Sequence, residues 1–573
     1  MVTRLDGEAA GERVGAVLIA LLALCAFFTL FIFRAADDNR LTSWQWVFDG
    51  ADAARMGGIL VAGLALAYPL SKVSLPRCHP AAVLFLASFA IGTIFWREPE
   101  LIVDAARYFT QAKHLELYGI GSFLGGWGRE VAAWTDLPLV PFLYGVTFAV
   151  WGESRLPIQV LTTLLFSGTV VLTYWLGTEL WDERIGAGAG ALLLGMPYLL
   201  TQVPLMLVDV PTMFFLTLAV LAAVKAVRRG GPGWMALASG AVACAVLSKF
   251  STWPLLSVLG VIVLVHAGKE PGAILRRAGA ILLAPAVLAG AVVLWKHDVI
   301  REQLRLLWGY QVPGLSRWRE SFASTFLFQI HPFITAAAAY SVVAAFRKRD
   351  SRYAIVAWAL LLIVLFRIER IRYLLPTLPM LALMASYGLG EIKSREIRRF
   401  TVACAVTASL VVAVFGYLPH AMSLSAVNLK DAGAYLDSIG GGPVEVVTLP
   451  QAWSGINPAV SVPLLDLFTT RRLVYRPDAV APPGEAGDRS PLRFTWDYRS
   501  PAYYSARPGA PDGAAALVLI LGRSDQPLPE AIERRISGYR LARAFQRSDE
   551  WFQYRTLVRI YRAPEGMPPG GRS

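Results

Sequence analysis

The residues most suited to chemistry are charged side chains that stand where polar segments meet apolar runs. Asp104 lies in the polar segment 97–118, directly after the apolar run 81–96, and Tyr108 follows it by four residues. On a helix, two residues four apart share one face. A carboxylate just outside a membrane span can remove a proton without the cost of standing in hydrocarbon. Asp104 is therefore our candidate base; the alternatives are a solvated loop acid and an acid paired with Arg107.

A second group of charged residues flanks other apolar runs. Asp209 stands between two runs, where an acid normally has a partner or a function; its alternative role is to cap a helix ahead of Pro211. Lys249 separates two further runs. A late polar cluster contains Arg367, Glu369, Arg370, Arg372 and Tyr373. Guanidinium groups suit phosphate, so this cluster indicates a bound anion. The alternative for each arginine is contact with lipid headgroups, or an ion pair with the glutamate.

The composition is that of an integral membrane protein. Of the 573 residues, 55% are hydrophobic and 17% charged, and the mean hydropathy is +0.50, whereas a soluble chain of this length carries more charge. The net charge of +13 does not indicate nucleic acid, because lysines and arginines gather in short loops between apolar runs. The histidines lack metal-ligand spacing and no nucleotide-binding motif occurs, so we expect no metal or cofactor.

Charge also predicts the topology of the chain. Thirteen apolar runs are long enough to cross a membrane, or nearly so: 14–33, 56–71, 81–96, 157–177, 186–203, 210–227, 234–248, 252–267, 278–295, 323–346, 354–366, 373–389 and 400–418. The basic loops follow even-numbered runs, which predicts that these loops and the N-terminus are cytoplasmic. The first run has a poorly basic flank and is predicted to be an uncleaved span.

The same count places the candidate residues on the outer face, in the loop 97–157 with Asp104, the turn at Asp209, and the stretches 249–252, 296–322 and 367–372. The run 137–151 is short and begins with two prolines. If it were counted as a span, the basic loops after it would lie on the outer side. We therefore predict that it is a re-entrant or partly inserted segment.

The composition changes near residue 419, which divides the chain into a membrane part, 1–419, and a smaller part, 420–573. Residues 428–449 predict a short helix, a glycine-rich turn and a strand, and 516–521 a second, buried strand. A helix is expected over 529–536, an alternating strand over 554–561 and a long loop over 476–493. About 150 residues suffice for one small α/β domain, which the topology places outside the membrane.

Five short motifs follow one another along the chain: Asp104-Ala-Ala-Arg-Tyr108, Pro138-Leu-Val-Pro141, Asp209-Val-Pro211, Ser248-Lys249-Phe250 and Arg372-Tyr-Leu-Leu-Pro376-Thr-Leu-Pro379. In their order they resemble the motifs of polytopic glycosyltransferases of the GT-C fold. The likeness is greatest to the dolichyl-phosphate-mannose protein mannosyltransferases and the bacterial lipid A aminoarabinose transferases, and it extends over about 97–390.

Three positions depart from the family pattern. Ala105 stands where the family usually has a second acid, and Phe250 replaces a glycine. Thr135 and Asp136 precede Leu137-Pro138 where the family often has a basic residue or histidine, which puts one contact to the donor phosphate in question. Two extra spans also precede the catalytic loop.

The resemblance implies an inverting enzyme that moves a sugar from a polyprenyl-phosphate carrier to a hydroxyl acceptor on a protein, lipid or glycan. It would act at the outer face of a membrane. A high content of alanine, glycine and arginine, with no cysteine after residue 419, is compatible with the inner membrane of a bacterial cell. Asp104 would be the base, and Asp209 would orient the sugar or acceptor, or hold an arginine in place. The residues expected to bind substrate are Arg107, Tyr108, Lys249, Arg367, Arg370, Arg372 and Tyr373.

Two other functions compete with this interpretation. Trp496-Asp497-Tyr498 is similar to a WWDYG motif of oligosaccharyltransferases, which are also GT-C enzymes. A lipid-linked sugar flippase would explain the spans and the anion-binding arginines. It would not need the domain after residue 419, and transporters usually show internal repeats, which this sequence lacks.

Overall fold

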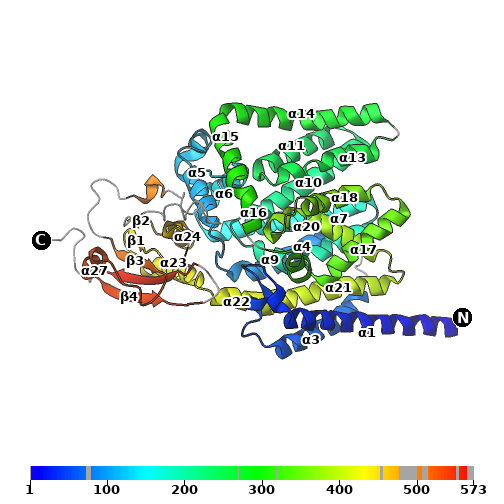
Figure 1. Cartoon of the computed structure of the whole chain (residues 1–573), viewed down its shortest axis with the longest axis horizontal. Helices are drawn as coiled ribbons and strands as arrows, with labels where there is room; N and C mark the ends of the chain where they lie inside the picture. The colour runs from blue at the N-terminus through cyan, green and yellow to red at the C-terminus, as the bar shows by residue number, and fades with distance from the viewer. Residues whose placement is uncertain are drawn as a thin grey trace.

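A computed structural model describes most of the chain, namely residues 2–72, 79–268, 270–317, 320–451, 454, 456–476, 500–505, 514–549 and 554–563. The motif Trp496-Asp497-Tyr498, and nearly all of the predicted loop 476–493, lie outside these residues. A bundle of helices forms the larger part of the molecule, and a β-sheet lies at one end of it (Figure 1). The N-terminal end of the first helix is at the opposite end of the bundle from the sheet.

The bundle contains helices of membrane-spanning length, as the hydropathy predicts. Within the described residues, seven helical segments are long and apolar enough to cross a membrane: Gly11–Ile32, Ala53–Lys72, Pro80–Arg97, Arg155–Leu180, Asp209–Arg229, Pro271–Trp295 and Arg395–Ser423. Four shorter apolar helices accompany them: Leu139–Trp151, Pro232–Ser248, Thr252–His266 and Tyr353–Leu365. The chain is thus an integral membrane protein, while the thirteen spans and their orientation stay predictions.

The long helices that build the bundle are α1 (Val2–Ile32), α3 (Ala53–Lys72), α4 (Pro80–Ile94), α7 (Arg155–Leu180), α10 (Asp209–Arg229), α11 (Pro232–Ser248), α14 (Pro271–Trp295), α17 (Pro332–Lys348), α18 (Tyr353–Leu365), α20 (Leu378–Leu389) and α21 (Arg395–Val411). Shorter pieces join them: α2 (Trp44–Val47), α12 (Thr252–Leu255), α13 (Val258–His266), α19 (Ile371–Leu374) and α22 (Leu418–Ser423). Helix α10 is the most enclosed of the seven long segments.

Two of the predicted spans divide into two helical segments at a proline. The run 186–203 divides into α8 (Glu183–Leu193) and α9 (Pro197–Gln202), and the run 323–346 into a π-helical segment η4 (Ser324–Ile330) and α17. A proline stands at the first position of both second helices. Proline has no N–H to donate and its ring suits the first helical turn, so each of these runs restarts at its proline.

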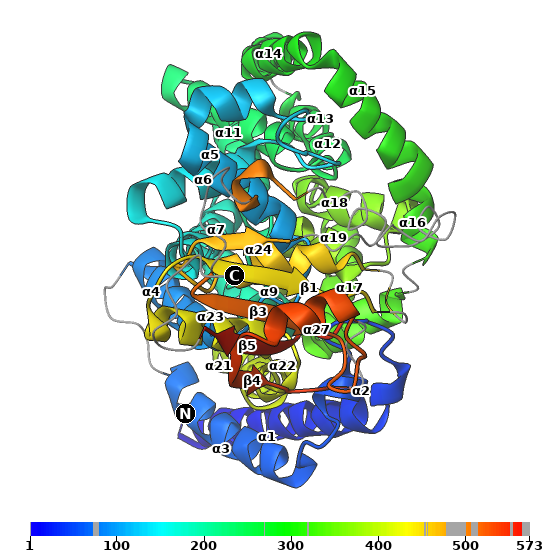
Figure 2. The same ribbon diagram turned by 90° about the vertical axis from the view of Figure 1, so that its left-hand side faces the viewer.

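Helices also cross the end of the bundle nearest the sheet. They are α5 (Ala105–Gly126), α6 (Leu139–Trp151), α15 (His297–Leu306), a π-helical turn η3 (Leu307–Gln311) and α16 (Val312–Arg317). The stretch 296–322, which was predicted to lie on the outer face, is therefore mostly helical (Figure 2). Val299, Ile300 and Gln303 of α15 are buried on one face, as in an amphipathic helix.

The sheet belongs to the part after residue 419 and contains the three predicted strands. It has the order β2-β1-β3-β5-β4, with β1 (Val444–Thr448), β2 (Leu473–Tyr475), β3 (Ala516–Leu521), β4 (Arg540–Phe545) and β5 (Leu557–Arg562). Strand β1 runs parallel to β2 and β3, and β5 runs antiparallel to β3 and β4. Every residue of β1 and β3 is buried, as in strands covered on both faces. The helices are α23 (Val427–Ile439), α24 (Ser461–Asp466) and α27 (Glu530–Ile536).

A charged cluster joins this sheet unit to α5. The Lys113 Nζ atom lies 2.9 Å from Glu153 and 2.5 Å from Asp466 at the end of α24. The Tyr504 hydroxyl donates to the same aspartate at 2.6 Å. Burial raises the pKa of Glu153 to about 8, with Asp466 adding to the rise and Lys113 opposing it. One lysine therefore holds two acids at the junction.

We expect Lys113→Met to loosen this junction. Removing the cation leaves the buried Asp466 and the largely buried Glu153 without their counter-charge, which costs about 3–5 kcal/mol. The variant should melt several degrees lower than the parent protein in detergent, and less so near pH 4, where the acids gain protons. An equal loss of melting temperature at neutral pH and at pH 4 would show that the lysine acts through packing rather than charge.

Candidate active site

A cavity of about 680 Å3 lies between the bundle and the sheet unit. Its lining comes from segments far apart in the chain, including the start of α5, residues 134–137, the turn between α11 and α12, the α15–α16 arm and α19. Ile456 and Tyr554 of the sheet unit complete one wall, and Arg40, Leu41 and Trp46 another. Most of the wall is apolar and only a few polar groups converge on it, which is typical of a site for a small molecule or a lipid-borne group.

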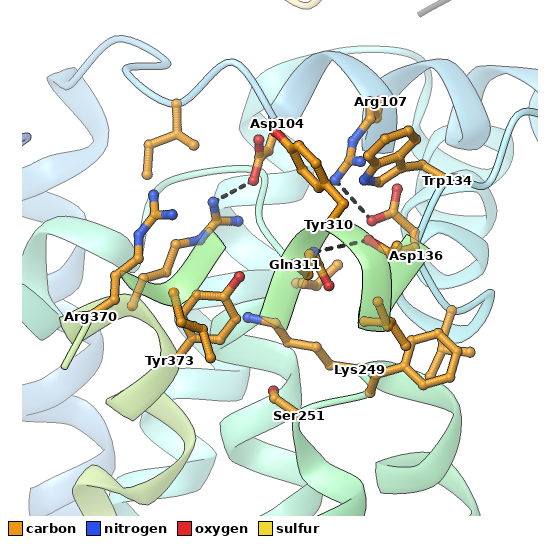
Figure 3. A pocket seen from close by; sticks show the side chains of 18 of the residues that line it. Asp104, Arg107, Trp134, Asp136, Lys249, Ser251, Tyr310, Gln311, Arg370 and Tyr373 are labelled. Carbon is orange, nitrogen blue, oxygen red and sulfur yellow. Dashed lines mark hydrogen bonds and ion pairs between the residues drawn. The ribbon is translucent and has the colours of Figure 1, made fainter. Parts of the chain in front are cut away.

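Four charged residues form a connected cluster at this cavity. Arg372 donates to both acids: its NH1 atom pairs with Asp104, and its Nε atom lies 2.8 Å from Asp209. The Nζ atom of Lys249 lies 2.5 Å from the other carboxylate oxygen of Asp209. The charges of two carboxylates and two cations thus neutralise one another, as the burial of charged groups requires. Figure 3 shows Asp104 and Lys249 facing the same space.

Local breaks in the helices bring these side chains together. Asp104 immediately precedes α5 and makes no capping hydrogen bond, so its carboxylate is available to Arg372. Lys249 ends α11 in an extended conformation, with φ −162° and ψ 138°. Arg372 lies in the single turn α19, whose first N–H group, that of Ile371, donates to Glu320 at 3.0 Å.

Asp104 keeps one oxygen for a ligand. Arg372 reaches its Oδ2 atom, and no hydrogen bond within the described part of the chain reaches Oδ1. Burial alone would raise the pKa of Asp104, but the guanidinium groups of Arg372 and Arg107 outweigh it and bring this pKa below its ordinary value. Asp104 is therefore ionised at neutral pH and has a free acceptor atom beside the cavity.

Asp209 is placed differently. It has no exposed surface and is not among the residues that line the cavity. Both of its oxygens are taken, one by Lys249 and one by Arg372. It is the first residue of α10 and no side chain caps that helix, so the capping alternative is not observed. Of the roles expected for it, holding an arginine is the one that this geometry fits.

The other predicted residues divide into two sets. Tyr108, Arg370 and Tyr373 line the cavity, and the Lys249 ammonium lies 4.8 Å from the centre of the Tyr373 ring. Asp104 and Tyr108 therefore share a face, as their spacing predicts. Arg367 is exposed and is not among the lining residues.

Arg107 does not pair with Asp104 as the local alternative proposed. Its guanidinium group instead lies 3.0 Å from Asp136, and the Gln111 amide donates to the same carboxylate at 3.0 Å. The expectations for Asp104 had not included this second acid at the cavity. The sequence did contain a signal for it, since Asp136 stands where the resembling family has a basic residue. Trp134, Tyr310 and Gln311, which also line the cavity, had no such signal.

Asp136 should make the folded protein less stable at neutral pH than in acid. Burial raises the pKa of Asp136 to about 6, against the pull of Arg107, so the folded state binds this proton more tightly than the unfolded chain does. The contribution is fully present below the unfolded pKa and is lost as the pH rises through about 6. Asp136→Asn should therefore gain about 2–3 kcal/mol at pH 7.5 and almost nothing at pH 4, measured as the melting-temperature difference from the parent protein. A variant less stable at pH 7.5 would show that the ionised form is the stabilising one.

Comparison with known proteins supports a glycosyltransferase-like fold. The profile of the family described as dolichyl-phosphate-mannose-protein mannosyltransferase matches residues 136–307. The crystal structure of ArnT from Cupriavidus metallidurans bound to undecaprenyl phosphate superimposes with a TM-score of 0.53 at 13% identity, over 86% of this chain and 99% of that one. The apo structure of the same protein superimposes with a TM-score of 0.50 at 13% identity, over 84% of this chain and 97% of that one. The archaeal oligosaccharyltransferase AglB from Archaeoglobus fulgidus superimposes with a TM-score of 0.43 at 11% identity, over 78% of this chain and 70% of that one. No curated protein sequence matches this chain.

These findings define the class of protein. The chain is an integral membrane protein with the GT-C fold, and the resemblance seen in its motifs is confirmed at the level of the fold. The matched profile includes Asp136, Asp209 and Lys249 but neither Asp104 nor Arg372. The roles of individual residues therefore depend on the geometry described above.

Proposed function

We propose that this protein transfers a sugar from a polyprenyl-phosphate carrier to a hydroxyl acceptor, with inversion, at the outer face of a bacterial inner membrane. The observation that carries the proposal is the cluster of Asp104, Arg372, Asp209 and Lys249 at a mostly apolar cavity. A carboxylate with one free oxygen and two cations at the same cavity are what such a transfer needs. The fold is that of a protein whose structure holds undecaprenyl phosphate, which supports this class of donor.

The reaction would proceed in one displacement. The acceptor oxygen attacks the anomeric carbon while its proton moves to Asp104 Oδ1, which acts as a general base. The bond between that carbon and the phosphate oxygen breaks, and polyprenyl phosphate leaves with its negative charge. Phosphate is already a good leaving group, so it needs cations rather than an acid. Lys249 and Arg372 supply them, with Arg370 at the rim.

Arg372 has a second task in this scheme. In the structure it pairs with Asp104, and a donor phosphate would compete for the same guanidinium group. Binding of the donor would then loosen this pair and release Asp104 for the acceptor. Asp209, which contacts Arg372 and Lys249 together, would keep both cations in place during the exchange.

The test is an assay of the full-length purified protein in detergent. Undecaprenyl-phosphate sugars are supplied with a crude acceptor extract from cell envelopes, and the release of undecaprenyl phosphate is followed by mass spectrometry. We expect acceptor-dependent release that persists in a chelator. No release in detergent, together with movement of the lipid across the membrane of vesicles that contain the reconstituted protein, would indicate the flippase alternative. Strict dependence of release on a divalent cation would indicate the oligosaccharyltransferase alternative.

A further inference from the structure

One corner of the cavity is not used by the transfer scheme. It is formed by Trp134, Asp136, Tyr310 and Gln311, and we call it the aromatic corner. Figure 3 shows Trp134 and Asp136 on the opposite side of the view from Arg370 and Tyr373, with Tyr310 and Gln311 at the centre, near Asp104 and Lys249. The corner joins two distant segments, the loop before α6 and the π-helical turn η3.

The backbone of this corner is strained and held in place. Trp134 has φ 45°, a left-handed conformation that a bulky residue rarely adopts unless its surroundings enforce it, and such strain gathers at ligand sites. Its ring meets Tyr310 edge to face, with centroids 5.8 Å apart. The α15–η3 arm supplies the constraint: Gln303 donates to the Asp136 carbonyl at 2.8 Å, and Gln311 donates to the Thr135 hydroxyl at 3.1 Å. The π-helical turn itself is a form often found at functional sites.

The polar groups of the corner suit hydroxyl groups. Within the described residues, Asp136 Oδ1 accepts a hydrogen bond from Arg107 and Oδ2 accepts one from Gln111, whereas a carboxylate can accept about four. The Gln311 amide oxygen is a further acceptor at the cavity. An aromatic ring offers an apolar face on which the C–H groups of a sugar ring can pack.

The charge of the corner does not favour a phosphate, because its nearest cation, Arg107, is already paired with Asp136 at 3.0 Å. Asp136 would repel it, whereas Lys249 and Arg372 across the cavity attract it. The acid also stands where the resembling family often has a basic residue. The two sides of the cavity are thus suited to different parts of one ligand, an anionic part and a hydroxyl-rich part.

We propose that the aromatic corner binds the sugar ring of the donor and selects a neutral sugar over a uronic acid. This inference rests on the proposed function, since it assumes a donor whose phosphate lies at Lys249 and Arg372. Trp134 and Tyr310 pack against the ring, and Asp136 and Gln311 accept hydrogen bonds from its hydroxyl groups. A carboxylate on the sugar would face Asp136 and be repelled.

The test measures binding of three lipids to the full-length protein in detergent: undecaprenyl phosphate, its neutral hexosyl esters (mannosyl and glucosyl) and its glucuronosyl ester. The quantity of interest is the ratio of each Kd to that of undecaprenyl phosphate. We expect at least one neutral ester to bind about ten-fold more tightly than the bare lipid, and the glucuronosyl ester no more tightly than the bare lipid.

Variants then locate the preference. Trp134→Gly removes the ring and relieves the strained φ, so it should fold as well as the parent protein while losing the ten-fold ratio; Trp134→Phe should keep part of it. Asp136→Asn should reduce the difference in Kd between the neutral esters and the glucuronosyl ester. Matched controls are Trp151→Ala and Asp298→Asn, exposed residues outside the cavity lining, which should change no ratio.

The outcomes separate this inference from the proposed function. If the bare lipid binds but neither Trp134→Gly nor Asp136→Asn changes any ratio, the aromatic corner is not the sugar site, and the donor class stands. A preference for the glucuronosyl ester in the parent protein overturns the inference in the same way. If undecaprenyl phosphate and all its esters fail to bind, the donor class itself is wrong and this inference fails with it.

Discussion

Asp104→Asn is expected to abolish sugar transfer while leaving donor binding intact. Asparagine keeps the size and the hydrogen bond to Arg372 but cannot accept the proton of the acceptor. Loss of a general base typically costs about 10²–10⁴-fold in rate. The carboxylate also repels the donor phosphate, so its removal should leave the Kd for undecaprenyl phosphate unchanged or lower it. The effect should therefore appear in kcat and not in donor affinity.

The matched comparison is Asp209→Asn, an acid in the same cluster with no access to the cavity. This variant should weaken the hold on Arg372 and Lys249, so its stability and donor affinity should fall together with its rate. Arg367→Gln, at an exposed position outside the cavity lining, should behave as the parent protein. Near-normal turnover by Asp104→Asn would remove Asp104 from the mechanism, and a specific loss of kcat in Asp209→Asn alone would transfer the role to Asp209.

The position of Asp104 was open to prediction because it depends on local rules. The apolar run before it predicts a boundary, and the four-residue spacing to Tyr108 predicts a shared face. Both side chains do line the cavity. The strongly apolar elements were also predictable from the sequence: the run 210–227 corresponds to α10, Asp209–Arg229, and 516–521 to β3, Ala516–Leu521.

The partner of Asp104 was not open to prediction in the same way. Neighbours in sequence suggested Arg107, yet the cation that pairs with it lies 268 residues away. Such a choice depends on how α5, α10, α11 and α19 pack, and no periodicity in one segment contains that information. Two sequence signals grouped Asp104, Asp209, Lys249 and Arg372: the charge-based topology, which placed all four on the outer face, and the order of motifs in a resembling family. Neither signal specifies which cation contacts which acid.

Interruptions and polar helices account for most of the remaining differences. The restarts at Pro197 and Pro332 divide two predicted spans, because hydropathy averaged over a window does not register the loss of one N–H group. The α15–η3 arm was expected on the outer face, but its helices were not predicted. Its two glutamines hold the loop 134–136, so this omission also concealed the aromatic corner.

Arg372→Gln is expected to remove activity and to destabilise the fold together. Arg372 is the residue that contacts both acids, and its loss leaves Asp209 buried with one cation for two carboxylates. Breaking a buried pair in this way costs about 3–5 kcal/mol, and loss of a cation aimed at the leaving phosphate adds about 10²–10³-fold in rate. Arg372→Lys should recover little, because a single ammonium cannot reproduce the two separate donors that contact Asp104 and Asp209.

A double variant separates the two effects. In Arg372→Gln with Asp104→Asn, the remaining acid Asp209 is balanced by Lys249, so the cluster is neutral again. Most of the lost stability should return, seen as a melting temperature several degrees above that of Arg372→Gln alone, while transfer stays undetectable. If the double variant is no more stable than the single one, the charges of Asp104 and Arg372 are not coupled as their contact implies. Recovered transfer in that variant would show that neither residue takes part in the chemistry, and the base and the leaving-group cation would then have to be sought elsewhere in the cavity.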